Sequence, residues 1–123
     1  MEVVVVLGAS SDPTRYSYKA VELLKQYGHQ PIPVHPREKV VLALNVVSNL
    51  KELIEQKVSV DTLTMYVNPA LSTPLTQDIL ALEPKRVIFN PGTENPVLER
   101  ELSSHGIKVE EACTLVLLRT GQY

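Results

Sequence analysis

Short apolar runs typical of strands alternate along this chain with segments in which apolar residues recur at helical spacing. Residues 3–7 form a short run of β-branched and aliphatic residues that ends at Gly8, which is typical of a buried strand. Apolar residues then recur at helical spacing over 17–27, and Gly28 stands where such a helix would stop. The beginning of the chain therefore predicts a strand, a polar loop and a helix.

The rest of the chain repeats this alternation, with turn residues after each apolar block. Further strands are predicted at residues 30–34, 61–67, 86–89 and 107–109. The helices predicted between them cover residues 49–54, 72–82 and 95–106. Each of these helices begins with a residue that can cap a helix N-terminus, namely Asn49, Ser72 or Asn95.

Two apolar segments are less sharply defined by their pattern. Residues 40–47 predict a short edge strand, whereas residues 113–118 suit either a strand or a short helix. The prolines at positions 31 and 33 weaken the second strand, because proline cannot donate a hydrogen bond to a neighbouring strand.

Strands that alternate with helices predict an α/β fold: a Rossmann-like, doubly wound open parallel sheet with right-handed crossovers. A chain of 123 residues is long enough to bury one core, so residues 1–123 are expected to form a single domain. The expected strand order is an edge strand near 45–47, then the second, first, third, fourth and fifth strands. The switch point then lies between the first and third strands, and a ligand is expected beyond the carboxyl ends of the strands.

Composition excludes several classes of partner. The formal net charge of −2 argues against a nucleic-acid-binding surface, and no apolar segment is long enough to span a bilayer. The single cysteine, Cys113, cannot form an internal disulfide, and no basic region precedes the first strand as it would in a signal peptide. A cytoplasmic location is expected. The three histidines lack metal-site spacing, so no metal ligand is predicted.

The loop after the first strand carries the strongest functional signal. A strand, a turn of small residues and a helix N-terminus together direct backbone amides and the positive end of a helix dipole at one point, which favours phosphate. The dinucleotide fingerprint G-x-G-x-x-G is incomplete, because only Gly8 is in place and Ser10 and Pro13 stand where later glycines would be. The segment therefore favours a phosphorylated ligand other than NAD.

Turn residues also follow the other strands, and in a parallel sheet these loops converge on one edge. Glycine, proline and asparagine are common in any loop, but four such loops at one edge favour a binding site. Arg15 and Arg37 lie in two of them, with Lys39 close behind, and arginine can contact phosphate through two hydrogen bonds.

These motifs resemble those of a known family. They are Gly8-Ala9-Ser10 with Tyr16-Ser17, Pro33-Val34-His35-Pro36-Arg37, Tyr66-Val67-Asn68-Pro69, Asn90-Pro91-Gly92-Thr93-Glu94 and Cys113-Thr114. Over nearly its whole length the chain resembles the small stand-alone CoA-binding proteins, whose single domain is similar to the N-terminal CoA-binding domain of the succinyl-CoA synthetase alpha subunit. It departs from the family at residues 40–45, where the usual glycine is missing.

The resemblance implies a role for each matching residue. The pyrophosphate would be cradled by Gly8, Ala9, Ser10 and Ser17. The adenosine would be flanked by Val34, Pro36 and Arg37, and the adenine side lined by Tyr66, Asn68 and Pro69. The pantetheine arm would lie toward Asn90, Pro91 and Gly92. The phosphohistidine and the ligase machinery of the synthetase have no counterpart here, so no catalytic residue is expected.

The sequence thus predicts a module that binds coenzyme A or a short acyl-CoA without evident catalysis of its own. Two other classes of function stay open. An NAD(P)-binding enzyme domain would need an acidic residue where the second strand ends in His35-Pro36-Arg37, although Arg37 could suit the extra phosphate of NADP. A protein-interaction module on the same fold would show an exposed apolar patch, and a protein partner or homo-oligomer is open as well.

Overall fold

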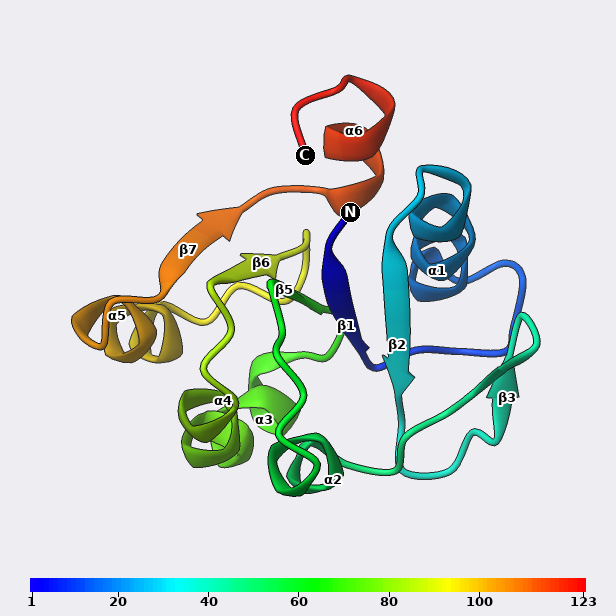
Figure 1. Ribbon diagram of the computed structural model, residues 1–123. Coiled ribbons are helices and arrows are strands. Elements are labelled where there is room, and N and C mark those ends of the chain that lie inside the picture. The colour runs from blue at the N-terminus through cyan, green and yellow to red at the C-terminus, as the bar shows by residue number, and fades with distance from the viewer.

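A five-stranded parallel sheet forms the centre of the protein (Figure 1). The computed structural model describes all residues, 1–123. Along the sheet the strands follow the order β2 (Gln30–Val34), β1 (Val3–Leu7), β5 (Thr62–Met65), β6 (Arg86–Phe89) and β7 (Lys108–Glu111). This is the predicted order of the five main strands, with β1 and β5 as neighbours. The fold is a single small Rossmann-like α/β domain.

Helices cover both faces of the sheet, as parallel strands require. They are α1 (Tyr16–Gln26), α2 (Leu50–Glu55), α3 (Pro69–Ser72), α4 (Thr76–Leu82), α5 (Pro96–Ser104) and α6 (Thr114–Arg119). Val4 and Val6 of β1 pack with apolar residues of α1 and α6, whereas Val5 and Leu7 pack with those of α2, α4 and α5. Side chains on β1 therefore alternate between two apolar layers that are both buried.

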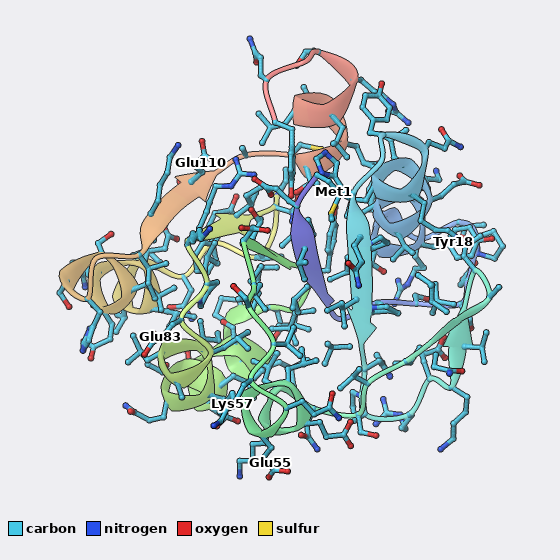
Figure 2. All side chains as sticks on the ribbon, viewed as in Figure 1. Met1, Tyr18, Glu55, Lys57, Glu83 and Glu110 are labelled. Atoms are coloured by element: carbon cyan, nitrogen blue, oxygen red, sulfur yellow. The ribbon has the colours of Figure 1, made fainter.

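The surface of the α2–α4 layer is charged. Glu55, Lys57 and Glu83 point outward from the ends of these helices (Figure 2). None of the helices combines the length and the apolar composition that a membrane-spanning segment requires.

Asparagine side chains cap the N-termini of three helices. The Oδ1 atoms of Asn49, Asn68 and Asn95 accept hydrogen bonds from the amides at the third helical position at 3.1, 3.1 and 3.2 Å. In α3 and α5 a proline follows the asparagine at the first helical position, where its missing N–H costs nothing. The predicted start of α5 is confirmed, and so is the capped start of α2.

The predicted start at Ser72 is wrong. The chain becomes helical at Pro69, after the Asn68 cap, and Ser72 is the buried last residue of α3. A 3-10 turn, η1 (Thr73–Leu75), then leads into α4. Pro74 lies in this turn and has no amide to continue the hydrogen bonds of α3, which explains the interruption.

The predicted edge strand over 40–47 is largely replaced by a separate antiparallel hairpin of β3 (Val40–Val41) and β4 (Leu44–Asn45). Only Val47 pairs with β2: its amide donates to the Pro33 carbonyl at 2.9 Å, and its carbonyl accepts from the His35 amide at 3.0 Å. Residues 31 and 33 face this outer edge, and both are prolines without an N–H. The edge of β2 can therefore hold only a single bridge.

Residues 113–118, which suited a strand or a helix, form most of α6. Leu115 and Leu118 of this helix are buried, and Leu118 packs against the α1 side of the sheet. The helix packs against α1 and therefore covers the same face of the sheet.

The hairpin turn between β3 and β4 holds two residues in left-handed backbone conformations. Leu42 has a φ of 48° and Ala43 a φ of 64°. A two-residue turn with both φ values positive is the type I′ turn, which strongly prefers glycine or asparagine. Lys25 of α1 donates to the Leu42 carbonyl at 3.1 Å, so the turn is anchored to the body of the domain.

Ala43→Gly is expected to raise the free energy of unfolding by about 0.5–1 kcal/mol. The left-handed conformation costs an L-residue roughly 1–2 kcal/mol, part of which is offset by the greater freedom of glycine in the unfolded chain. Urea denaturation would measure the change. As a control, Ala81→Gly in the exposed part of α4 should lower stability by about 1 kcal/mol. A loss of stability in Ala43→Gly would contradict the strain argument.

Candidate functional site

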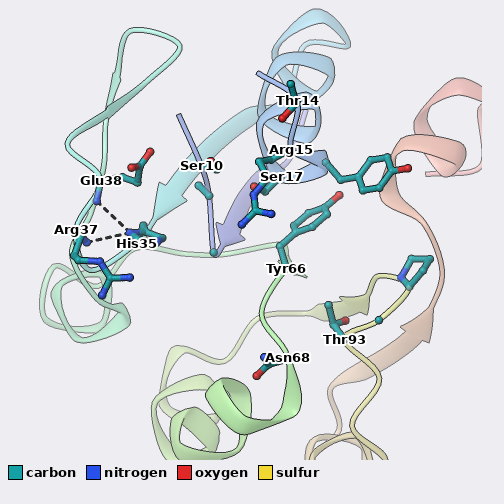
Figure 3. A pocket seen from close by; sticks show the side chains of 15 residues that line it. Ser10, Thr14, Arg15, Ser17, His35, Arg37, Glu38, Tyr66, Asn68 and Thr93 are labelled. Atoms are coloured by element: carbon teal, nitrogen blue, oxygen red, sulfur yellow. Dashed lines mark hydrogen bonds between the residues drawn. The ribbon is translucent and has the colours of Figure 1, made fainter. Parts of the chain in front are cut away.

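A cleft of about 860 Å³ opens at the carboxyl ends of β1, β2, β5 and β6 (Figure 3). Loops that lie far apart in the sequence contribute its walls. The lining residues are Gly8, Ala9, Ser10, Thr14, Arg15, Tyr16, Ser17, His35, Arg37, Glu38, Tyr66, Asn68, Pro91, Gly92 and Thr93. The loops therefore meet at the edge of the sheet where the sequence predicted a ligand.

Most of the predicted site residues line this cleft: Gly8, Ala9, Ser10, Arg15, Ser17, Arg37, Tyr66, Asn68, Pro91 and Gly92. The other four lie elsewhere. Val34 and Pro36 line an adjoining apolar pocket, Asn90 lines a second one, and Pro69 lines neither because it forms the first turn of α3. Five further residues line the cleft although they were not predicted as site residues: Thr14, Tyr16, His35, Glu38 and Thr93.

The N-terminus of α1 is the electropositive part of the cleft. Arg15 occupies the N-cap position without a capping side chain, and no acidic residue stands in the first turn. The first hydrogen bond of the helix runs from the Lys19 amide to the Arg15 carbonyl at 3.2 Å, so the amides of residues 16–18 have no backbone acceptor. These free amides, the helix dipole and the Arg15 guanidinium all favour an anion. The asparagine-capped helices have no comparable opening.

Gly8 turns the chain out of β1 under a tight steric constraint. Its φ is +90°, and a Cβ atom here would lie 2.7 Å from Cγ1 of Val67 and 3.0 Å from the carbonyl oxygen of Tyr66. The amides of Gly8 and Ala9 both donate to the Val34 carbonyl, at 2.9 and 3.2 Å. The need for glycine thus arises inside the protein, and the amides at the start of the loop are already occupied.

Gly8→Ala is therefore expected to destabilise the fold itself. Gly92 offers a matched control, because its φ is +89° but nothing lies within 4 Å of the position of its Cβ. Both substitutions carry the cost of a left-handed alanine, and Gly8→Ala adds an overpacking cost of about 1–3 kcal/mol. Thermal denaturation of the two variants would measure the difference. Equal stabilities would show that the β5 end moves aside without cost.

The loop after β2 is folded around His35. Its Nδ1 atom accepts hydrogen bonds from the amides of Arg37 and Glu38 at 3.0 and 3.1 Å (Figure 3). These bonds hold both residues at the cleft. The Glu38 carboxylate in turn accepts a hydrogen bond from the Ser11 amide of the first loop. Hydrogen bonding to Ser11 keeps the pKa of Glu38 below its usual value.

Asn90 acts as an internal brace. Its Nδ2 atom donates to Oγ1 of Thr64 at 2.7 Å and to the Met65 carbonyl at 2.8 Å, and its Oδ1 accepts from the Thr114 amide at 2.9 Å. The side chain is 2% exposed. Asn90 therefore positions the ends of β5 and β6 and the start of α6, and its side-chain groups are engaged within the protein.

Two apolar pockets flank the polar cleft. The first, about 350 Å³, shares Gly8, His35 and Arg37 with the cleft. Its other lining residues are Leu7, Val34, Pro36, Ser48, Asn49, Leu50, Val67, Leu71 and Leu75. A ligand in the cleft can thus extend toward β2 over an apolar surface.

The second pocket, about 340 Å³, lies on the other side and shares Tyr16, Tyr66 and Pro91 with the cleft. It is completed by Asn90, Cys113, Leu115, Val116 and Arg119. The hydroxyl of Tyr66 is buried without a hydrogen-bond partner, and its burial raises the pKa of this phenol. The site therefore consists of a polar centre between two apolar ends.

Fold and cleft together define a Rossmann-like α/β domain with a ligand-sized cavity at the switch point of its sheet. The sequence model of the CoA binding domain family matches residues 2–119. The chain therefore belongs to the CoA-binding domain family, and the resemblance drawn from its motifs is confirmed.

Solved structures agree with this fold. An uncharacterized protein is 42% identical with a TM-score of 0.92, covering 100% of this chain and 98% of that one. A Thermus thermophilus protein is 28% identical with a TM-score of 0.87, covering 99% and 90%. A dinucleotide-forming acetyl-coenzyme A synthetase from Ca. Korarchaeum cryptofilum, in complex with phosphate and ADP, is 20% identical with a TM-score of 0.74. That match covers 90% of this chain and 25% of the synthetase and shows the fold alone. A comparison with curated proteins found no significant match.

Proposed function

We propose that this protein is a binding module that holds coenzyme A or a short acyl-CoA across the cleft. One observation carries the proposal: the uncapped N-terminus of α1 lies in a cleft with an apolar pocket on either side. Coenzyme A has the matching sequence of parts, an adenine ring, a set of phosphates and a long arm that ends in a thiol. Membership of the CoA-binding domain family supports the same ligand.

The phosphates would occupy the polar centre. The free amides at the start of α1 and the cations Arg15 and Arg37 line it, and neither arginine is engaged in an ion pair. A volume of about 860 Å³ suits a ligand of this size, since small-molecule pockets span roughly 300–1,000 Å³. Cationic side chains and helix amides together recognise phosphate by charge and by hydrogen bonding.

The adenosine would lie on the β2 side. Val34 and Pro36 give that pocket an apolar wall suited to a purine ring, and Ser48 and Asn49 add polar groups at its rim. Arg37 lines both this pocket and the cleft, so it stands between a base and its phosphates. This placement agrees with the roles that the family resemblance implied for Val34, Pro36 and Arg37.

The pantetheine arm would run the other way, between Tyr16, Tyr66 and Pro91, into the pocket that contains Cys113. The apolar parts of the arm would pack against the apolar residues of this pocket, such as Leu115 and Val116. The thiol or acyl end would then approach the start of α6.

An NAD(P)-binding domain is the second candidate, and one observation favours it. Glu38 follows β2 and lines the cleft, and NAD sites use a carboxylate in this region to bind the ribose hydroxyls. The two candidates differ in the ligand that binds, so one titration panel distinguishes them.

Isothermal titration with coenzyme A, acetyl-CoA, NAD and NADP is expected to give binding of the two CoA compounds.

Arg37→Ala should weaken CoA binding by about 1–3 kcal/mol, because it removes a hydrogen bond to a charged group. Its stability should hardly change, since the side chain is exposed and unpaired. Arg100→Ala on α5 removes the same charge outside every described pocket and should bind like the parent. Binding of NAD without binding of CoA would refute the proposal.

The direction of the arm is tested by Cys113, the only cysteine in the chain. Acetyl-CoA should slow alkylation of Cys113 by iodoacetamide, as followed by mass spectrometry, because the arm would cover the thiol. Adenosine 3′,5′-bisphosphate lacks the arm and should leave the rate unchanged at saturation. If both ligands bind and neither slows alkylation, the arm does not enter this pocket.

A further inference from the structure

The loop between β1 and α1 uses most of its backbone amides within itself or against β2. The Gly8 and Ala9 amides donate to the Val34 carbonyl. Further along, the Asp12 amide donates to Oγ of Ser10 at 3.0 Å and the Thr14 amide to Oδ1 of Asp12 at 2.9 Å. These contacts fix the shape of the loop and leave few donors for a ligand.

Ser11 differs from the rest of the loop. Its amide donates to the carboxylate of Glu38, a side chain that belongs to the loop after β2 and lines the cleft. Ser11 thus donates to an anionic side chain of another loop. The amides of Gly8, Ala9, Asp12 and Thr14 instead donate within their own segment or to the end of β2, and the Ser10 amide has no acceptor. A carboxylate oxygen that accepts from a backbone amide makes the same contact as a phosphate oxygen would make there.

The position of Glu38 is built into the structure. The His35 ring holds the Glu38 amide at 3.1 Å, and the β3–β4 hairpin begins two residues later, so the side chain starts from a fixed point. The cations Arg15 and Arg37 line the same cleft. Glu38 is therefore the one acidic residue among the residues that line it, and it faces a region otherwise suited to anions.

We propose that Glu38 is an internal competitor for the phosphates of the ligand. In the free protein its carboxylate holds the Ser11 amide, and a bound phosphate displaces it and takes that amide. Glu38 thereby lowers the affinity for phosphorylated ligands and reduces the part of that affinity that comes from the charge of their phosphates. This inference rests on the proposed function only in that the cleft takes phosphates. It needs neither the adenosine nor the arm.

The test uses Glu38→Gln, which removes the charge but keeps an acceptor, and Glu38→Ala, which removes both. The control is Glu55→Gln, because Glu55 points outward from α2 and changes the net charge equally (Figure 2). Each protein is titrated with inorganic pyrophosphate, coenzyme A and uncharged adenosine at one pH. Glu38→Ala should bind pyrophosphate and coenzyme A about two- to fivefold more tightly, the range of an exposed charge interaction, and Glu38→Gln should show part of this gain. Adenosine affinity should not change.

Each result has a defined meaning. Unchanged or weaker binding of both anions by the Glu38 variants would overturn the inference, and so would an equal gain in Glu55→Gln. Weaker binding of coenzyme A and adenosine with unchanged pyrophosphate binding would also overturn it and would assign Glu38 to the ribose hydroxyls. If pyrophosphate binds more tightly to the variants while coenzyme A binds to no protein, the inference stands and the proposed function fails. If neither anion binds to any protein, both fail.

Discussion

The close approach of Gly8 to the end of β5 is the constraint on which the rest of the site depends. β1 lies between β2 and β5 in the sheet, and the chain leaves it through Gly8, whose left-handed backbone lies close to Val67 and Tyr66. At the same point the Gly8 and Ala9 amides bind the end of β2. Three strand ends are thereby held together, and the loop is directed so that α1 begins over the switch point.

The helix N-termini of this domain differ in how their first amides are satisfied. Asn49, Asn68 and Asn95 satisfy the first turns of α2, α3 and α5 with their own side chains. The start of α1 has no such cap and opens into the cleft. Unsatisfied amides are tolerable there because water or an anion can reach them. The contrast explains why an anion would bind at α1 and at none of the three asparagine-capped helices.

The cleft balances its charges. Arg15 and Arg37 would attract phosphates, and Glu38 opposes them from the same loop that carries Arg37. Such a balance would make binding depend on the shape and the apolar ends of a ligand as well as on its charge, since a small anion gains nothing from the flanking pockets. Asn90 contributes indirectly, because its hydrogen bonds keep the ends of β5 and β6 at a fixed separation.

The sequence by itself determined the strands, their parallel order and the loops that meet at the cleft, because burial period and turn residues are local signals. Tertiary structure decided what depends on distant partners. It reduced the edge strand to one bridge, since the two prolines of β2 face outward, and it moved a helix start from Ser72 to Pro69. It also determined that the Asn90 side chain hydrogen-bonds within the protein and that the Glu38 carboxylate accepts from the Ser11 amide. A hydrogen bond between loops 27 residues apart exists only once the sheet has brought them together, so no local pattern could reveal it.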